Sequence, residues 1–534
     1  MAGQTRRGGG QPPGCPGARL TADQSVPTEP LSKKRTGPGA SGGHAKRLSG
    51  DVAIYGSGRI ALQLLAFFTL PVLTHVFTNS QYGVIETATT VFSVVMLVAP
   101  LGLESASQRS YFDYSDEQVD ERRLVLGTTV WAMSASGAFL GALLIAFSGV
   151  LSQALLGSRS YAIVFVLTGA TVPLATLLNF TQEVLRLRHR PAQYVALALF
   201  AGVMNTAATL FLILVVDSGV KGVVAGTLIG MGTGLLVGYP LIAKSVGTGF
   251  SRPVLRTMLA YGLPFIPVAA ATWAIQLADR FFLLAYFSTS ELGIYSLGAK
   301  YANLLMLAVY AFGAAWAPFF LDLHSRDAEE ERRVRAKALS VLMLLLTWGA
   351  IAVTASSRAF IQVFTSSDFR DAYKVIGLLS VGIIVIGMNS VVIGGISIAR
   401  KTHYFVRYTA YAAAANIALN FALIPPLGMV GAAIATLLTY VVLTVLYSWR
   451  AQRLDPVDFN WDRIARILIA GALCMVPANL VFLHPLWLEI VFKSALIVGY
   501  PLVAFVLGGV DADALTSTRA FLTSLRRRQP GVTQ

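Results

Sequence analysis

The chain has 534 residues, of which 55% are hydrophobic and 13% are charged, and it carries a net charge of +15 with a mean hydropathy of +0.64. Soluble domains carry about 25% charged residues, so this composition excludes a soluble domain and predicts an all-α, polytopic membrane protein. Two cysteines, and six histidines without ligand spacing, exclude a disulfide framework and a metal site. The basic residues fall in short loops between apolar segments, so membrane orientation explains the charge without nucleic acid as a partner.

Residues 1–50 form a polar opening segment rich in Gly, Pro, Ser, Lys and Arg. Such a composition cannot bury a core, so we expect a disordered, basic, cytoplasmic arm. Two roles stay open for the arm: a solvated tail that fixes orientation, which we favour, and contact with anionic lipid of the cytoplasmic leaflet. At the other end, residues 510–534 are expected to form a cytoplasmic tail.

Fourteen apolar segments lie between these tails, and each is long enough for a span of about 20 residues. The first six are at 52–77, 82–103, 124–150, 160–183, 193–216 and 222–243. The next six are at 258–287, 291–321, 338–364, 372–398, 404–424 and 428–449, and two more are at 464–483 and 486–509. Pro264 and Pro267 are expected to interrupt the seventh span near its start.

The connecting segments place positive charge on one side of the predicted membrane. With a cytoplasmic N-terminus, 33 of the 42 Lys and Arg residues lie in cytoplasmic segments, six on the opposite side and three within spans. By the positive-inside rule, this predicts a multi-pass protein of the cell inner (plasma) membrane with both termini cytoplasmic.

An internal repeat divides the chain. The stretch FTNSQYGVI (77–85) matches FSTSELGIY (287–295), and GVKGVVAGT (219–227) matches GMVGAAIAT (428–436). Each copy holds six spans, and an even number preserves orientation, so the copies should be related by an axis along the membrane normal. This predicts a first six-helix lobe at 51–249, a second at 250–450, and two additional transmembrane helices at 451–509.

Several motifs in a fixed order carry a family resemblance. They are SGRIALQLLAFFTLPVLTHVFTNSQYGV at 57–84, YGLPFIP at 261–267, ADR at 278–280, ELGIYSLGAKYANLL at 291–305 and NIALNFALIPPLGMVGAAIAT at 416–436. Together they resemble the Wzx-type polysaccharide flippases of the multidrug/oligosaccharidyl-lipid/polysaccharide exporter superfamily. The resemblance covers residues 50–450, and the basic arm is not part of the family pattern.

The resemblance implies two six-helix lobes that face each other around a central cavity. It implies alternating access, which moves a polyprenyl-pyrophosphate-linked oligosaccharide from the cytoplasmic to the outer leaflet for export of O-antigen (lipopolysaccharide), capsule or exopolysaccharide. The implied partners are the lipid-linked oligosaccharide and, in addition, a polysaccharide polymerase or other export machinery.

Three cations lie inside predicted spans: Arg59, Arg280 and Lys300. A charged residue at the bilayer centre costs about 2.5–3.5 kcal/mol, so such residues usually face a polar interior. At about 1.5 Å of rise per residue, the three should lie at three depths, with Lys300 near the midplane. Successive cations would keep a pyrophosphate paired throughout its crossing, which makes them candidate substrate-binding residues. Snorkelling to the nearer interface is the alternative for Arg59 and Arg280.

Two carboxylates, Asp279 and Glu86, also lie within spans. Each could bind Na⁺ or a proton as a coupling ion, or could pair with a cation of the other lobe, and we favour pairing. No other cofactor is expected. The aromatic residues Tyr295, Tyr301 and Trp273 could stack on sugars, although lone aromatic side chains in spans usually serve packing or the interfacial belts.

Three classes of function remain in competition. The favoured class is the lipid-linked oligosaccharide flippase, of which a lipid II flippase is a close variant. A cation-coupled drug exporter of the same superfamily is the second, and twelve spans would suit it better. A membrane glycan polymerase or ligase ranks last, because an enzyme would need a large outer loop or clustered carboxylates, and the predicted outer loops are short with few acids.

Overall fold

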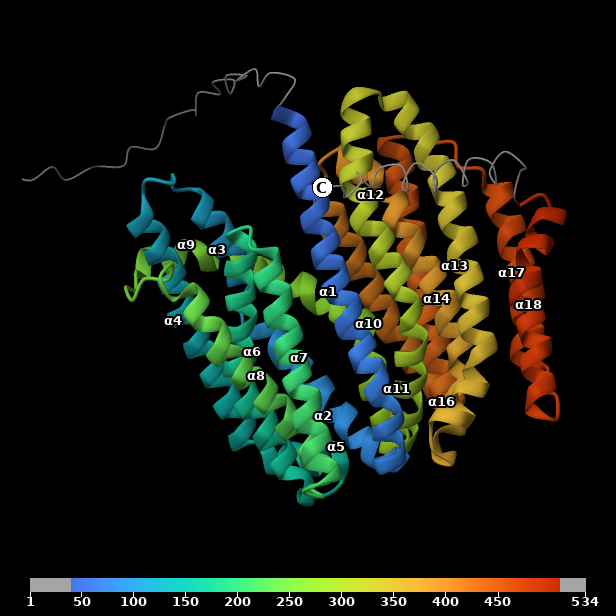
Figure 1. The fold of residues 1–534 in the computed structure, drawn as a ribbon, viewed down its shortest axis with the longest axis horizontal. Coiled ribbons are helices and arrows are strands. Elements are labelled where there is room, and N and C mark those ends of the chain that lie inside the picture. The colour runs from blue at the N-terminus through green and yellow to red at the C-terminus, as the bar shows by residue number, and fades with distance from the viewer. Residues whose placement is uncertain (1–39, 510–534) are drawn as a thin grey trace, which may run out of the picture. The chain divides into compact units, whose positions relative to one another are not determined.

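The computed structural model describes residues 40–509 of the chain. In its first helix, the side chains of residues 40–55, 57 and 59 lie outside this description. From residue 40 to residue 509 the chain is built of helices and short connections, with no strand (Figure 1). The predicted all-α fold class is therefore confirmed.

The helices before residue 250 are α1 (Ala40–Val76), α2 (Asn79–Val98), α3 (Leu103–Phe112), α4 (Val119–Ala146), α5 (Ser148–Leu156), α6 (Ala162–Leu187), α7 (Pro191–Leu214) and α8 (Val220–Ala243). The later helices are α9 (Arg252–Gly262), α10 (Ile266–Tyr286), α11 (Thr289–Ala302), α12 (Met306–Arg326), α13 (Ala328–Phe364), α14 (Tyr373–Val392), α15 (Gly394–Ile398), α16 (His403–Leu454), α17 (Trp461–Leu480) and α18 (Leu486–Val506). Short 3-10 helices are η1 (Arg159–Tyr161), η2 (Leu263–Phe265), η3 (Asn303–Leu305) and η4 (Ser367–Ala372). Helix α1 begins inside the segment expected to be a disordered arm, and the remainder of that arm, 1–39, and the tail 510–534 lie outside the described residues.

The helices account for the predicted membrane spans. Twelve helical stretches are long and apolar enough to cross a membrane, and the shorter apolar stretch Ile60–Val76 of α1 is additional to them. Helix α16 counts once among the twelve, although its backbone is non-helical at Gly428. Taking the two parts of α16 as separate spans and adding α1 gives the predicted fourteen, so the chain is a multi-pass membrane protein.

The kink in α16 has a counterpart in the first half of the chain. Gly428 has φ 57° and ψ −137°, and Gly219, which precedes α8 in the matching motif, has φ 59° and ψ −150°. An L-residue with a side chain is strained at such positive φ values, which explains glycine at both positions. The sequence repeat thus corresponds to a repeated backbone turn.

Proline breaks the seventh span, as predicted. Helix α9 ends at Gly262, the 3-10 turn η2 contains Pro264, and α10 begins with Pro267 in its first turn. The structure adds two interruptions that the sequence did not indicate, one between α2 and α3 and one at η3 between α11 and α12.

We use the name first lobe for α2–α9, because α9 packs with the helices that precede it. Helices α4, α6, α7 and α8 form one bundle, and α9 lies against α3 and α4. Met258 of α9 is fully buried in the same apolar cluster as Leu126, Leu178 and Ile242. The chain therefore leaves this core at Gly262, later than the boundary suggested by the repeat, because an apolar face of α9 is covered by the first lobe.

The second lobe comprises α10–α16, in which α16 packs on α10 and α14, and α13 packs on α14. Helices α17 and α18 lie beside α13 at the edge of this lobe (Figure 1). Helix α1 touches both lobes. Its Leu62 is close to Gly202 of α7, while its Phe67 stacks on Phe360 of α13 with ring centroids 5.1 Å apart.

The lobes meet most closely where α2 packs on α11. A Cβ atom at Gly83 would lie 1.8 Å from the carbonyl oxygen of Thr289, and one at Gly293 would lie 2.1 Å from that of Asn79. Because both obstacles are backbone atoms, only glycine allows this approach. We call it the Gly83–Gly293 contact.

Candidate functional site

The site lies one helical turn beyond the Gly83–Gly293 contact and joins the two lobes. Glu86 of α2 is fully buried and accepts a hydrogen bond from the guanidinium of Arg280 on α10, at 2.7 Å. Its other oxygen receives the ammonium of Lys300 on α11. Lys300 also donates to the hydroxyl of Tyr82, at 2.9 Å, one turn before Glu86 on the same helix. We call Tyr82, Glu86, Arg280 and Lys300 the Glu86 cluster.

Local sequence fixes the two helices that carry this cluster. The hydroxyl of Thr78 caps α2 by accepting from the N–H of Gln81, and the hydroxyl of Ser288 caps α11 by accepting from the N–H of Glu291. Capping side chains of this kind define where a helix begins. With both starting points fixed and glycine at the crossing, Glu86 faces the second lobe.

The Glu86 cluster carries an excess of positive charge. One carboxylate is bound by two cations, and the Tyr82 hydroxyl that completes the set is neutral. The side chain of Arg280 is 12% exposed, whereas that of Lys300 is 38% exposed and remains reachable from outside the cluster. An uncompensated charge inside a membrane is costly unless it faces a polar cavity or an oppositely charged ligand. The arrangement can therefore bind an anion between the lobes.

The expected separation of Arg280 and Lys300 by depth is wrong. Both side chains reach the same carboxylate, because their long aliphatic chains extend from neighbouring helices toward α2. Nor does Arg280 snorkel to an interface, since its guanidinium is bound to Glu86. The side chain of Arg59 lies outside the described part of the structure, and only its place in α1 is defined.

Asp279 behaves differently from Glu86. It is 4% exposed, and one of its oxygens accepts a hydrogen bond from the hydroxyl of Tyr295 on α11. Its Oδ1 atom is buried without a hydrogen-bond partner among the described residues. The expected pairing with a cation of the other lobe is thus wrong for Asp279, whose partner is a hydroxyl of its own lobe. Glu86 does pair with cations of the other lobe.

A second contact joins α2 and α10, seven residues after Glu86 on α2 and seven residues before Arg280 on α10. The indole N–H of Trp273 donates to the hydroxyl of Ser93, at 2.9 Å. Beside it lies an open cavity of about 410 Å³ lined by residues of α2, α6, α8 and α10. Its polar lining comes from Thr89 and Ser93 of α2 and Asn179 of α6, and the rest of the lining is apolar.

Sequence reasoning did not identify Tyr82, Ser93 and Asn179 as site residues. Tyr82 could have been found, because it precedes Glu86 by four residues and therefore shares its helix face. Ser93 and Asn179 offered no such signal, since single hydroxyl and amide residues in apolar spans are common helix-packing residues.

Two further buried ion networks lie outside the lobe interface. Arg335 binds Glu331 and Asp455, linking α13 to the end of α16. Burial favours a higher pKa for Asp455, but hydrogen bonds and charge from Arg332 and Arg335 outweigh it and hold the pKa of this carboxyl below its usual value. The other network joins Glu489 of α18 to neighbouring cations and fastens α18 to α13. Among the described residues, no group of His, Cys, Asp and Glu side chains could hold a metal ion.

Comparisons with known proteins identify a family and a similar fold. A family model described as polysaccharide biosynthesis protein matches residues 72–374, more than half of the chain. The fold is similar to that of the lipid II flippase MurJ in an inward closed conformation, with a TM-score of 0.68 and 14% identity, covering 84% of this chain and 98% of that one.

Two curated proteins of Haloferax volcanii are similar in sequence. The probable low-salt glycan biosynthesis flippase Agl15 is 21% identical over 45% of this chain and 53% of its own length. The probable flippase AglR is 27% identical over 44% of this chain and 50% of its own length. The chain thus spans about half the length of these curated relatives.

Proposed function

Because the chain belongs to the polysaccharide biosynthesis protein family, we propose that it is a flippase for a lipid-linked oligosaccharide. It moves a glycan on a polyprenyl pyrophosphate from the cytoplasmic to the outer leaflet of the cell inner membrane, for export as a polysaccharide. The names of the two Haloferax relatives support flippase activity. It acts as a transporter and not as an enzyme.

The observation that carries this proposal is the excess positive charge of the Glu86 cluster. A pyrophosphate binds best to charge-assisted donors, and the ammonium of Lys300 and the guanidinium of Arg280 supply them at the lobe interface. The partial exposure of Lys300 gives an anion access to the cluster. Arg59 of α1 is proposed as a further cation for this head group.

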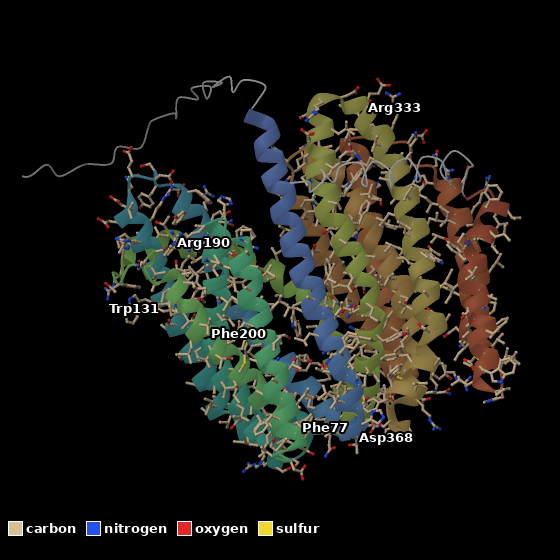
Figure 2. The ribbon with its side chains drawn as sticks, in the orientation of Figure 1. Phe77, Trp131, Arg190, Phe200, Arg333 and Asp368 are labelled. Atoms are coloured by element: carbon tan, nitrogen blue, oxygen red, sulfur yellow. The ribbon has the colours of Figure 1, made fainter. Side chains whose placement is uncertain are left out.

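The distribution of charge supports an orientation for the transport cycle. Arg190 and Arg333 lie toward one end of their helices, and Phe77 and Asp368 lie at the opposite end (Figure 2). We assign the end with Arg190 and Arg333 to the cytoplasm, where basic residues are enriched. The Gly83–Gly293 contact then closes the outer side, and alternating access requires it to open. Both termini are cytoplasmic in this orientation.

We further propose that Asp279 carries the coupling proton. A buried carboxylate without a cationic partner is stable when neutral, and Asp279 has only the Tyr295 hydroxyl and an unpartnered oxygen. Tyr440 of α16 is close enough to interact with it electrostatically, and Arg280 is its neighbour in sequence. A proton held here would be released when the lobes rearrange and water reaches the site.

The test of the flippase proposal compares Lys300→Ala with Lys300→Arg. Removing the Lys300 charge leaves Glu86 paired with Arg280, so the protein should insert and fold normally. In cells or proteoliposomes, Lys300→Ala should lose at least about 90% of glycan flipping, since about 1.4 kcal/mol of lost binding is tenfold. Lys300→Arg should retain part of the activity, because charge is kept and shape is not.

The matched control is Lys221→Ala, an exposed lysine at the start of α8. It should flip glycan at the wild-type rate. Glycan flipping by Lys300→Ala at the wild-type rate would refute the assignment of an anion site. Efflux of a cationic dye that Lys300→Ala leaves intact, with no glycan flipping by the wild type, would favour the drug-exporter alternative.

A further inference from the structure

The second contact between α2 and α10 has a chemistry different from the first. Glu86 with Arg280, and Ser93 with Trp273, are each separated by seven residues on both helices. Seven residues of helix rise about 10 Å. The two helices therefore run antiparallel and present a charged level followed, about 10 Å away, by an aromatic and hydroxyl level.

The cavity begins at the second level. Thr89 and Ser93 contribute from α2, Asn179 from α6, and Ala269, one turn from Trp273, from α10. At about 410 Å³ it falls within the range of about 300–1,000 Å³ typical of small-molecule sites. It lies on the side of the Glu86 cluster away from the Gly83–Gly293 contact, because Thr89 and Ser93 follow Glu86 along α2.

The polar groups of this region are available for a ligand. Asn179 is exposed in the cavity and makes no side-chain hydrogen bond to another described residue. Gln276 is also exposed and without a side-chain hydrogen bond in the described part of the chain, and it lies on α10 between Arg280 and Trp273. Polar amides in a span are expensive unless a cavity or ligand satisfies them.

We propose that this cavity binds the sugar directly attached to the pyrophosphate, which extends the proposed flippase function and rests on it. A pyranose ring has an apolar C–H face that packs on aromatic surface and hydroxyl groups that bond to amides. Trp273, whose N–H is bonded to the lining residue Ser93, supplies aromatic surface at the edge of the cavity. Asn179 supplies an amide from the lining itself, and Gln276, exposed on α10 three residues from Trp273, supplies a second beside it. A polyprenyl tail would leave those amides unsatisfied, which favours a sugar as the occupant.

The inference makes Trp273, Asn179 and Gln276 residues of glycan specificity, distinct from the head-group residues Lys300 and Arg280. The head group is common to every polyprenyl-pyrophosphate-linked glycan, so its binding cannot select a sugar. Selection then depends on how the first ring fits against Trp273 and which hydroxyl or acetamido groups reach the amides.

The experiment measures binding of two probes to the purified full-length protein in detergent: polyprenyl pyrophosphate, and the same lipid carrying one N-acetylglucosamine. In Trp273→Leu, the dissociation constant for the sugar-bearing lipid should rise about fivefold to tenfold, while that for the bare lipid changes less than about twofold. Trp273→Phe should fall between, because the ring is kept and the N–H is lost. Asn179→Leu should also weaken the sugar-bearing lipid alone.

Trp131→Leu is the matched control, since Trp131 (labelled in Figure 2) is an exposed tryptophan of α4 whose N–H donates to the backbone oxygen of Thr248 and which does not line the cavity. It should leave both constants unchanged. Equal weakening of both probes by Trp273→Leu, or no weakening of either, would overturn the sugar assignment while the flippase proposal stands. Failure of the wild type to bind the bare lipid, or insensitivity of that binding to Lys300→Ala, would instead count against the proposed function.

Discussion

The Gly83–Gly293 contact gives the sharpest test of how the lobes move. We consider Gly83→Ala, which adds one methyl group where α2 crosses α11. That carbon would lie 1.8 Å from the carbonyl oxygen of Thr289, so no side-chain rotation can relieve the clash. Within α2 itself alanine is better than glycine by about 1 kcal/mol, so the helix is not weakened. The substitution acts on the contact between lobes.

The free-energy cost of Gly83→Ala follows from the close approach of α2 and α11. Overpacking a close contact costs about 1–3 kcal/mol. A free-energy difference of about 1–3 kcal/mol corresponds to a factor of about 5–150 in population. Conformations in which α2 and α11 are apart should therefore gain by that factor in Gly83→Ala. The same reasoning applies to Gly293→Ala, whose added carbon would lie 2.1 Å from the oxygen of Asn79.

Accessibility of a cavity cysteine measures this shift. Thr89→Cys, in a chain with Cys15 and Cys474 replaced by serine, places one thiol in the cavity lining. An impermeant maleimide added from the side of Thr78 should react at least about fivefold faster in Gly83→Ala than in the parent. Gly149→Ala is the control, since a Cβ there meets nothing within 4 Å. Equal labelling rates in Gly83→Ala and the parent would refute the proposal that the Gly83–Gly293 contact closes the outer side.

Four further predictions concern three charged side chains and the membrane topology. Glu86→Gln leaves Arg280 and Lys300 without their carboxylate, so it should lower the stability measured by thermal unfolding by about 3–5 kcal/mol. Inorganic pyrophosphate should raise the Tm of this variant more than that of the wild type. A Tm of Glu86→Gln that pyrophosphate does not raise would argue against an anion site. Asp279→Asn should keep lipid binding but abolish the dependence of flipping on a proton gradient, and persistent dependence in proteoliposomes would exclude Asp279 as the coupling group. Because the folded pKa of Asp455 is depressed, its stabilisation is present above the ordinary value of about 3.9 and is lost as pH falls below it, so Asp455→Asn should flatten this part of the Tm–pH profile. External labelling should reach Ser218→Cys and miss Ser325→Cys, and the reverse pattern would invert the proposed topology.

The length of the apolar segments and the internal repeat explain why so much of the fold could be predicted from the sequence. Apolar length alone identifies spans, because a bilayer forces each backbone to satisfy its own hydrogen bonds. The duplicated motif predicted two copies of six spans, and the structure adds that Gly219 and Gly428 of this motif share a positive-φ conformation. The packing of α9 on the first lobe was not predictable, because the sequence repeat does not indicate which helices cover the apolar face of α9.

The site could be predicted in composition but not in geometry. Charged residues in spans are conspicuous, so Glu86, Arg280 and Lys300 were identified from sequence. The predicted difference in depth between Arg280 and Lys300 was wrong, because it was calculated from the position of each residue along its helix and ignored the length of the two side chains. The convergence on Glu86 depends on the glycine crossing of α2 and α11, which no single-helix argument contains.

The two copies of the repeat differ at the positions of Glu86 and Lys300. Under the proposed function, this difference links substrate binding to the opening of the Gly83–Gly293 contact. The position equivalent to Glu86 is Ser296, and that equivalent to Lys300 is Thr90, so the ion pair can form only across the lobes. Without substrate, Glu86 holds the two cations and thereby holds α2 against α11. A pyrophosphate carries more negative charge than one carboxylate and competes for the same donors. Substrate arrival would therefore release Glu86 and weaken the outer contact at the moment when opening to the outer leaflet is required.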